Sequence, residues 1–111
     1  MKFDHTWTLL KEGKKTQTCR REIYYDWYKN KVGDVIWAEP PENSDDKEIL
    51  LKVTEVFKVP LWVVAASPDH YTREGYSSGE QFKQVWREIY GPSSWNPPDQ
   101  VVCVLRFKVL K

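Results

Sequence analysis

The chain has 111 residues, of which 41% are hydrophobic, so it is long enough and apolar enough to fold as one domain around one core. Lysine and arginine total 17 against 16 acidic residues, and the net charge of +1 excludes a global attraction to nucleic acid. The first residues lack the apolar run of a signal peptide, and the longest uncharged apolar stretch, residues 61–66, is too short to cross a bilayer, so we expect a soluble, cytoplasmic protein.

The first third of the chain predicts a helix, a strand and a loop. Residues 6–12 are followed by Gly13, and a glycine directly after a short apolar segment is a common helix end. Residues 15–20 alternate loosely and contain two threonines and a cysteine, which is typical of a short strand. Residues 22–31 are rich in aromatic and charged side chains, and we expect an irregular loop there.

The middle of the chain predicts two strands joined by an exposed loop. Gly33 and Asp34 predict a turn that leads into a strand at residues 35–38. Residues 39–47 contain two prolines and several acidic residues, which is the pattern of a solvent-exposed loop. Residues 49–59 are rich in β-branched side chains and predict the clearest strand of this half.

The strongest helical pattern follows a candidate capping box at Ser77 and Glu80. Apolar residues then recur at helical spacing, namely Phe82, Val85, Trp86, Ile89 and Tyr90. Gly91 and Pro92 predict the end of this helix. Residues 101–110 predict a strand whose first half is apolar on both faces and is therefore covered on both sides.

Strands separated by helical segments, with a long strand at the C-terminal end, indicate a small barrel with helices across its openings. We therefore expect an α+β fold for a single domain over residues 1–111. It would be built on a β-barrel of about five to six strands with two or three helices.

A basic segment follows the first predicted helix. Residues 14–21 contain four cations with hydroxyl groups between them. In a regular strand Lys15 and Thr18 point to opposite faces, so a joint role needs a turn or bulge near residues 13–16. The alternative is a solvated basic strand edge that discourages aggregation.

Two other segments are candidates for function. Glu74 stands before Gly75 at the entrance of the strong helix, where its carboxylate can be held pointing inward. The alternative is an ordinary exposed loop glutamate. The aromatic residues 24–28, near Arg20 and Arg21, suit stacking on a base while the guanidinium groups meet phosphate. The alternative is a partly buried flap that closes one end of the barrel.

The sequence gives no support to a metal site. Cys19 and Cys103 form no cluster with histidine at the spacing of metal ligands, and we expect two reduced thiols. His70 has no paired ligand or nucleophile close to it in sequence. We therefore expect neither a metal ion nor an organic cofactor.

Several of these motifs occur together at a defined spacing. Gly13, Lys15 and Arg20 fit a G-x-K-x-x-E-x-R pattern, residues 33–34 form a Gly-Asp pair before a strand, and residues 74–91 join a Glu-Gly pair to aromatic residues at helical spacing. This arrangement resembles the ASCH superfamily of RNA-associated proteins over almost the whole chain. The resemblance implies a PUA-like fold with a basic cleft between the first predicted strand and the loop that holds Glu74.

One departure narrows the resemblance. Thr18 stands where the general signature has glutamate, and this is similar to the small acetylcytidine amidohydrolases with the motif G-x-K-T-x-T-x-R. The resemblance implies a catalytic set of Lys15, Thr18 and Glu74. In the implied reaction Thr18 attacks the acetyl carbonyl and Lys15, deprotonated in a desolvated pocket, takes its proton. Glu74 then orients the base or carries protons to the leaving amine.

The leading hypothesis is therefore recognition of RNA or a modified nucleoside in the basic cleft, with hydrolysis of the acetylcytidine amide as its sharpest form. Outside the catalytic set, the residues expected to bind substrate or RNA are Gly13, Lys14, Arg20, Arg21, Tyr25 and Trp27. One alternative is a non-catalytic RNA-binding module, whose affinity would fall steeply with salt. The other is a ribonuclease. We expect a monomer whose partner is RNA or a modified nucleoside, without a membrane partner.

Overall fold

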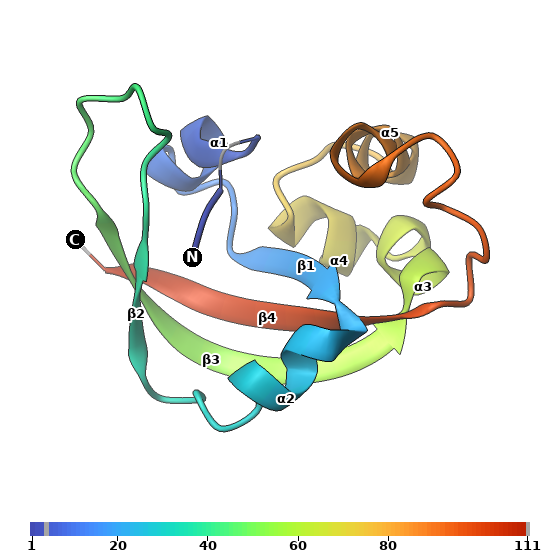
Figure 1. Cartoon of the computed structure of the whole chain (residues 1–111), viewed down its shortest axis with the longest axis horizontal. Helices are drawn as coiled ribbons and strands as arrows, with labels where there is room; N and C mark the ends of the chain where they lie inside the picture. The colour runs from blue at the N-terminus through green and yellow to red at the C-terminus, as the bar shows by residue number, and fades with distance from the viewer. Residues whose placement is uncertain (4, 111) are drawn as a thin grey trace.

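The computed structural model describes residues 1–3 and 5–110, and its centre is an antiparallel sheet (Figure 1). The strands of this sheet are β1 (Gln17–Arg21), β2 (Val35–Ala38), β3 (Ile49–Pro60) and β4 (Val101–Leu110). Their order is β1-β4-β3-β2, so β4 lies between β1 and β3, and β1 and β2 are the edges. The three later strands are confirmed, and β1 begins two residues after its predicted start.

The sheet does not close into the predicted barrel of five to six strands. Within the described residues it has four strands, and no backbone ladder joins the edges β1 and β2. Residues 1–3 lie along β2 instead, because Lys2 forms a parallel bridge with Glu39 and the Glu39 N–H donates to the Met1 carbonyl. On the other side of the gap, Arg20 of β1 donates to the Lys2 carbonyl at 2.7 Å. A short extended segment and one guanidinium thus occupy the place of the missing ladder.

The helices are more numerous than the two or three predicted. In the described part of the chain they are α1 (Trp7–Lys11), the 3-10 helix η1 (Glu22–Tyr24), α2 (Tyr25–Tyr28), α3 (Leu61–Ala66), α4 (Pro68–Arg73) and α5 (Gly79–Tyr90). The helix before Gly13 and the long helix after Ser77 are confirmed. The segment 22–31, predicted as a loop, is largely helical. None of these helices is long and apolar enough to cross a membrane, in the residues that the structure describes.

The cap of the strongest predicted helix, α5, lies one residue later than predicted. Ser78, rather than Ser77, accepts the hydrogen bond from the Gln81 N–H at 3.1 Å. The Gln81 side chain returns the interaction by accepting from the Ser77 N–H at 2.9 Å. The cap therefore pairs a serine with a glutamine, and Glu80 instead forms an exposed ion pair with Lys83.

The sheet is covered by two apolar clusters. The first includes Leu61 and Val64 of α3, Phe82 and Trp86 of α5, and Val104 of β4. The second packs α1 against the opposite part of the sheet, and its buried members include Trp7, Leu10, Leu51, Leu105 and Phe107. Residues 102–105 of β4 are all buried, which confirms that the first half of this strand is covered on both faces. Val104 of the first cluster and Leu105 of the second point to opposite faces of β4, and Figure 1 shows α1 and α5 toward opposite ends of this strand.

Candidate functional site

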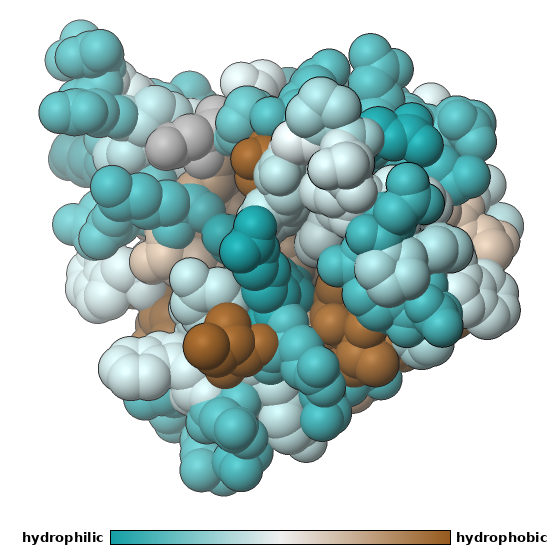
Figure 2. Space-filling view, turned by 45° about the vertical axis from the view of Figure 1, so that its right-hand side comes forward, coloured by the Kyte–Doolittle hydropathy of each residue, from teal (hydrophilic) through white to brown (hydrophobic). Residues whose placement is uncertain are grey.

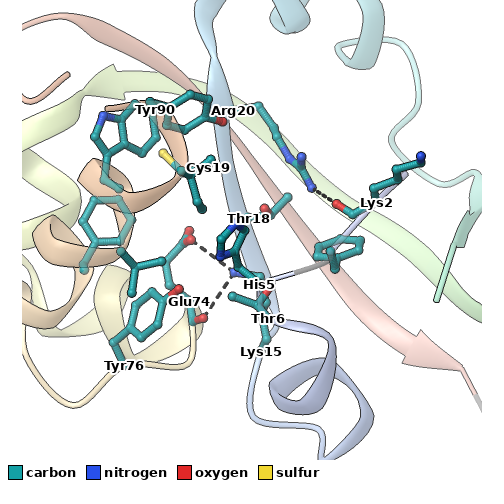
Figure 3. A pocket seen from close by; sticks show the side chains of 15 residues that line it. Lys2, His5, Thr6, Lys15, Thr18, Cys19, Arg20, Glu74, Tyr76 and Tyr90 are labelled. Carbon is teal, nitrogen blue, oxygen red and sulfur yellow. Dashed lines mark hydrogen bonds and ion pairs between the residues drawn. The ribbon is translucent and has the colours of Figure 1, made fainter. Parts of the chain in front are cut away.

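A cavity of about 200 Å³ opens beside β1, at the edge of the sheet (Figure 3). Its polar side is formed by Lys15, Thr18, Arg20 and Glu74, and its aromatic side by Tyr76, Phe82, Trp86 and Tyr90. The N-terminal segment around Phe3 completes the lining. An engineered protein cavity of about 150 Å³ holds a benzene molecule, so this volume suits one ring with a small substituent.

Lys15 and Glu74 form a buried ion pair in this cavity. Lys15 Nζ lies 3.3 Å from Glu74 Oε1 and also donates to the Glu74 main-chain carbonyl at 3.2 Å. Each residue is only 3% exposed. Burial lowers the pKa of Lys15 and raises the pKa of Glu74, and in each case the partner's charge opposes the shift. Because the charged form of both groups is disfavoured, moving a proton between them costs less than it would in water.

Lys15 lies just before the ladder of β1 and lines the same cavity as Thr18. The Thr16 N–H donates to the Arg73 carbonyl at 2.8 Å, whereas the Thr16 carbonyl accepts from the Phe107 N–H at 3.0 Å. The chain therefore passes from contact with the end of α4 into the ladder with β4 at this residue. Lys15 and Gln17, two residues apart, both reach the Glu74 carboxylate, as residues on one face of a strand do. Lys15 and Thr18 therefore line one cavity because it takes side chains from both faces of β1, and no bulge is needed.

Glu74 enters the cavity from the end of α4, where it is the last residue before a sharp turn. Gly75 makes that turn with φ of +101°, a conformation that favours glycine. A Cβ at this position would also lie 2.9 Å from a Leu9 side-chain carbon. The inward-pointing carboxylate expected from the Glu-Gly pair is therefore present, and the exposed alternative is wrong.

Thr18 contributes a hydroxyl that is free to act on a ligand. The residue is buried and lines the cavity, and its hydroxyl makes no hydrogen bond to the residues that the structure describes. Figure 3 shows the Thr18 side chain on β1 between the Lys15–Glu74 pair and Arg20. The Lys15 amine, whose pKa is lowered by burial, lines the same cavity, and a hydroxyl nucleophile is activated by such a base once the two come within hydrogen-bond reach.

Arg20 lies at the other end of the polar side. Its Nη2 donates to the Lys2 carbonyl, and its guanidinium lies over the Phe3 ring at 5.2 Å. The Nε atom is buried and has no hydrogen-bond partner among the described residues. The residue lines the cavity, but this nitrogen itself is closed off from a molecule in it.

Gln17 is a site residue that the sequence reasoning missed. It is fully buried, and its Nε2 donates to Glu74 Oε2 at 2.9 Å while its Oε1 accepts from Arg106 Nε at 2.9 Å. The same Nε2 lies 3.1 Å from His70 Nδ1. Burial, together with the nearby charge of Arg106, lowers the pKa of His70, which favours the neutral ring that accepts from the amide. The only signal in the sequence was a neutral amide between the cations of the basic segment.

The remaining predicted binding residues lie outside this cavity. Gly13 ends α1 with φ of +74°, and Lys14 is exposed and pairs with Glu12. Arg21 is exposed and stacks over the Tyr90 ring at 5.0 Å. Tyr25 lies under the ammonium of Lys58, and Trp27 is 69% exposed on α2. The aromatic side of the cavity comes instead from Tyr76 and α5, whose rings were interpreted only as a helical repeat.

The two thiols are free and buried, as expected for reduced cysteines. Cys19 faces Val104 across the ladder and Cys103 faces Arg20, so the two side chains lie on opposite faces of the sheet. Cys19 lines the cavity, and burial raises the pKa of its thiol well above the usual value. No group of three or more His, Cys, Asp and Glu residues is placed to hold a metal ion in the described residues.

A second feature is an exposed apolar surface on η1, α2 and β2. Its large side chains are Ile23, Tyr24, Trp27, Val35 and Trp37, all of which are exposed. Figure 2 shows that hydrophobic side chains reach the surface in separate groups among hydrophilic ones on the face that it presents. We call these five residues the α2 surface.

Comparison with known proteins identifies the fold. No family model and no curated protein matches the chain. Among solved structures, it is similar to an ASCH domain from Lactobacillus crispatus JV V101, with a TM-score of 0.67 and 19% identity over 92% of this chain and 68% of that one. Protein EF3133 from Enterococcus faecalis V583, described under the family DUF984, gives a TM-score of 0.68 and 18% identity over 96% and 68%.

The similarity extends to a structure that is close to this chain in length. The hypothetical protein PH0355 gives a TM-score of 0.65 and 18% identity, and the match covers 99% of this chain and 96% of that one. At these identities the likeness concerns the fold. This likeness agrees with the PUA-like fold that the resemblance of the sequence motifs to the ASCH superfamily predicts.

Proposed function

From the premise that the chain has the fold of an ASCH domain, we propose that it is an amidohydrolase that removes the acetyl group from acetylcytidine. The observation that carries this proposal is the meeting of three groups in one cavity of about 200 Å³. These groups are the buried Lys15–Glu74 pair and the Thr18 hydroxyl. The substrate class follows from the match of residues 13–20 to the motif of the small amidohydrolases.

The first half of the reaction forms an acetyl ester on Thr18. Neutral Lys15 takes the hydroxyl proton as Thr18 Oγ1 bonds to the acetyl carbon, and the carbonyl electron pair moves onto its oxygen. Return of that pair breaks the carbon–nitrogen bond. The leaving cytidine amine takes a proton from the Lys15 ammonium or from Glu74, which restores neutral charge on the product.

The second half restores the enzyme. Neutral Lys15 deprotonates a water molecule, which attacks the ester carbon. Collapse of the intermediate then breaks the bond between this carbon and Thr18 Oγ1. Thr18 recovers its proton and acetate leaves. One amide and one water thus give one carboxylic acid and one amine, without an oxidant, a reductant or a cofactor. Gln17 supports both halves by fixing Glu74 Oε2 while Oε1 remains beside Lys15 Nζ.

The rest of the cavity suits a flat, largely neutral substrate. Tyr76 and Trp86 offer aromatic surface against which a pyrimidine ring can pack. The Arg20 guanidinium, which lines the cavity, suits a ribose or phosphate oxygen. Because a nucleoside carries no phosphate, its KM should respond little to salt.

The test is turnover of acetylcytidine by the purified protein, followed as cytidine release by chromatography. Thr18→Val keeps the shape of the side chain but removes the nucleophile, whereas Thr18→Ser keeps a hydroxyl and should retain part of the activity. Lys15→Met should lower kcat by about 10²–10⁴-fold, because it removes the base. Arg87→Ala, an exposed change on α5 outside the cavity, serves as the control.

Two results would count against the amidohydrolase. Wild-type protein that releases no cytidine at a concentration high enough to detect slow catalysis excludes this substrate. Full activity in Thr18→Val, with loss in Lys15→Met, excludes Thr18 as the nucleophile and makes water the attacking group.

One observation favours a second candidate, a non-catalytic RNA-binding module. The α2 surface exposes Tyr24, Trp27 and Trp37, and the cation Lys29 lies next to α2. Stacking of a base on an aromatic side chain contributes about 1–3 kcal/mol. For a module, Trp27→Ala should weaken binding of single-stranded RNA about 5- to 150-fold, and affinity should fall steeply with salt. RNA binding that is unaffected both by Trp27→Ala and by a higher salt concentration would exclude an RNA-binding role of the α2 surface.

A further inference from the structure

The free edge of β1 faces the cavity, and the register of the sheet determines which backbone groups it presents. The Phe107 N–H donates to the Thr16 carbonyl, and Gln17 lies opposite Arg106. In an antiparallel ladder, hydrogen-bonded pairs alternate with pairs whose backbone groups point away from the partner strand. Thr18 and Arg20 therefore bond to β4. Cys19 directs its N–H and carbonyl toward the outer edge.

Cys19 is the outward-facing residue of β1 at the cavity. It lines the cavity together with Thr18 and Arg20, one residue to either side. Figure 3 shows Cys19 on the side of Glu74 and Tyr90, with Arg20 on the other side of the strand. No other strand pairs with this edge in the described part of the chain. The Cys19 N–H is thus a fixed donor at the cavity that the ladder leaves unused.

The position of this donor relative to Thr18 is set by covalent geometry. The Cys19 nitrogen belongs to the peptide bond that Thr18 begins, so it lies within a few bonds of the Thr18 hydroxyl. In α/β-hydrolases the backbone N–H of the residue after the nucleophile is one of the donors to the oxyanion. A preorganised N–H of this kind stabilises the charge that develops on the carbonyl oxygen during attack.

We propose that the main-chain N–H of Cys19 is the oxyanion donor of this site, acting on the acyl oxygen of a substrate attacked by Thr18. The inference rests on the proposed amidohydrolase function and adds the group that accepts its negative charge. The side chain of Cys19 takes no part. As the carbonyl electron pair moves onto oxygen, the hydrogen bond from the N–H strengthens, and it weakens again when the carbon–nitrogen bond breaks.

The test removes this N–H while leaving the side chain constant. Lactic acid is incorporated at position 19, which gives the methyl side chain of a Cys19→Ala variant but turns the N–H into an ester oxygen. Acetylcytidine is the probe, and Cys19→Ala with its normal peptide bond is the matched control. Removal of one oxyanion donor costs about 10²–10³-fold in kcat, and the loss should fall on kcat rather than KM. A simpler variant, Cys19→Pro, also lacks the donor, and an edge strand tolerates proline where its N–H faces outward.

The outcomes separate the inference from the function on which it rests. A kcat of the lactate variant that falls by the expected factor below that of Cys19→Ala, at an unchanged unfolding midpoint, supports the inference. Equal kcat in the lactate and Cys19→Ala proteins overturns the inference and leaves the amidohydrolase standing. Absence of turnover in wild type overturns both. If Cys19→Pro unfolds, the lactate variant alone tests the inference. Proline fixes the backbone torsion φ, whereas the ester of the lactate variant does not.

Discussion

Glu74 uses its two carboxylate oxygens for different tasks. Oε1 faces Lys15 Nζ at 3.3 Å, whereas Oε2 accepts from Gln17 Nε2 at 2.9 Å. Gln17 in turn accepts from Arg106, which bonds to Glu55 and Asp69 at the surface. A buried carboxylate is costly unless its lone pairs are used, so Gln17 supports the charged form of Glu74 without competing for Lys15.

Replacing Gln17 by methionine tests this support. The variant keeps the approximate length of the side chain but leaves Glu74 Oε2 and Arg106 Nε without this partner. We expect the free energy of unfolding to fall by about 1–3 kcal/mol. The pKa of Glu74 should rise further, because the hydrogen bond from Gln17 lowers it. Urea unfolding measures the first effect, and the acid limb of the activity profile, moved to higher pH, measures the second.

The control for this change is Gln84→Met, an exposed glutamine of α5. A surface substitution of this kind should alter stability by no more than about 0.5 kcal/mol. Equal stabilities of the two methionine variants would contradict a structural role for the Gln17 amide.

Lys15→Met isolates the titration of Glu74. Burial already raises the pKa of Glu74 above its ordinary value of 4.5, and loss of the Lys15 charge raises it further. The folded state then binds the Glu74 proton more tightly than the unfolded state. The contribution of Glu74 to stability is therefore full below pH 4.5 and is lost as the pH rises through the folded pKa. The slope cannot exceed about 1.4 kcal/mol per pH unit for one proton.

Urea unfolding of Lys15→Met across this pH range measures the decline. The double variant Lys15→Met/Glu74→Gln has no ionisable group at the pair and should lose this pH dependence. It should also be at least as stable as Lys15→Met at neutral pH, because no lone buried carboxylate remains. A flat profile in the single variant would show that its Glu74 does not hold a proton in the fold.

At the scale of elements, the position of α5 determines the aromatic side of the cavity. α5 begins at Gly79, and a Cβ at this residue would lie 1.9 Å from the Ala65 carbonyl oxygen of α3. A backbone oxygen cannot swing aside as a long side chain can, so any larger residue must push the two helices apart. Phe82, Trp86 and Tyr90 would move with α5.

Gly79→Ala is therefore expected to lower the free energy of unfolding by about 1–3 kcal/mol or more, as overpacking does. It should also raise KM for acetylcytidine, because the aromatic side of the cavity is displaced. Thermal unfolding and steady-state kinetics measure the two effects. Ser78→Ala is the matched comparison, since it removes only the helix cap and costs about 1 kcal/mol. A Gly79→Ala protein with wild-type stability and KM would show that α3 yields without cost.

The elements that the sequence predicted are those with a local signal. Residues 49–59 are rich in β-branched side chains and α5 carries helical periodicity, and both elements are present, although the cap of α5 is Ser78. α3 and α4 were missed because each is only six residues long. Their usable signals were the spacing of buried Leu61 and Val64, and Pro68 at the first helical position of α4. Such short segments are helical because they pack against the sheet and one another, which the local sequence does not record.

The site was predictable to the extent that motif residues carry it. Lys15, Thr18 and Glu74 line one cavity, although 59 residues separate the ion pair. Gln17 was not predictable, because its partner Arg106 lies 89 residues away and meets it only through the pairing of β1 with β4. The predicted stacking role of Tyr25 and Trp27 was assigned by closeness in sequence to Arg20. The fold places both of them outside this cavity.

At the scale of the whole molecule, the cavity exists because the sheet stays open. A strand inserted between β1 and β2 would complete the predicted barrel and would cover the edge at which Cys19 and Thr18 meet the cavity. Residues 1–3 fill only part of the gap, and Phe3 lines the cavity itself. Arg20 connects this segment to β1 through the Lys2 carbonyl. The same side chain therefore bridges the gap in the sheet and lines the cavity.

Arg20→Ala should loosen this closure without unfolding the sheet. The Lys2 carbonyl loses its partner on β1, and Phe3 loses the guanidinium that lies over its ring. The Glu39 N–H, which donates to the Met1 carbonyl at 2.8 Å, should then exchange with solvent deuterium faster, because local opening of residues 1–3 frees it. Amides of β4 should keep their protection, since β4 lies inside the sheet. Arg21→Ala is the control, because its guanidinium stacks on Tyr90 and makes no contact with the gap. Equal exchange of Glu39 in the two variants would show that the backbone pairing along β2 holds the segment without Arg20.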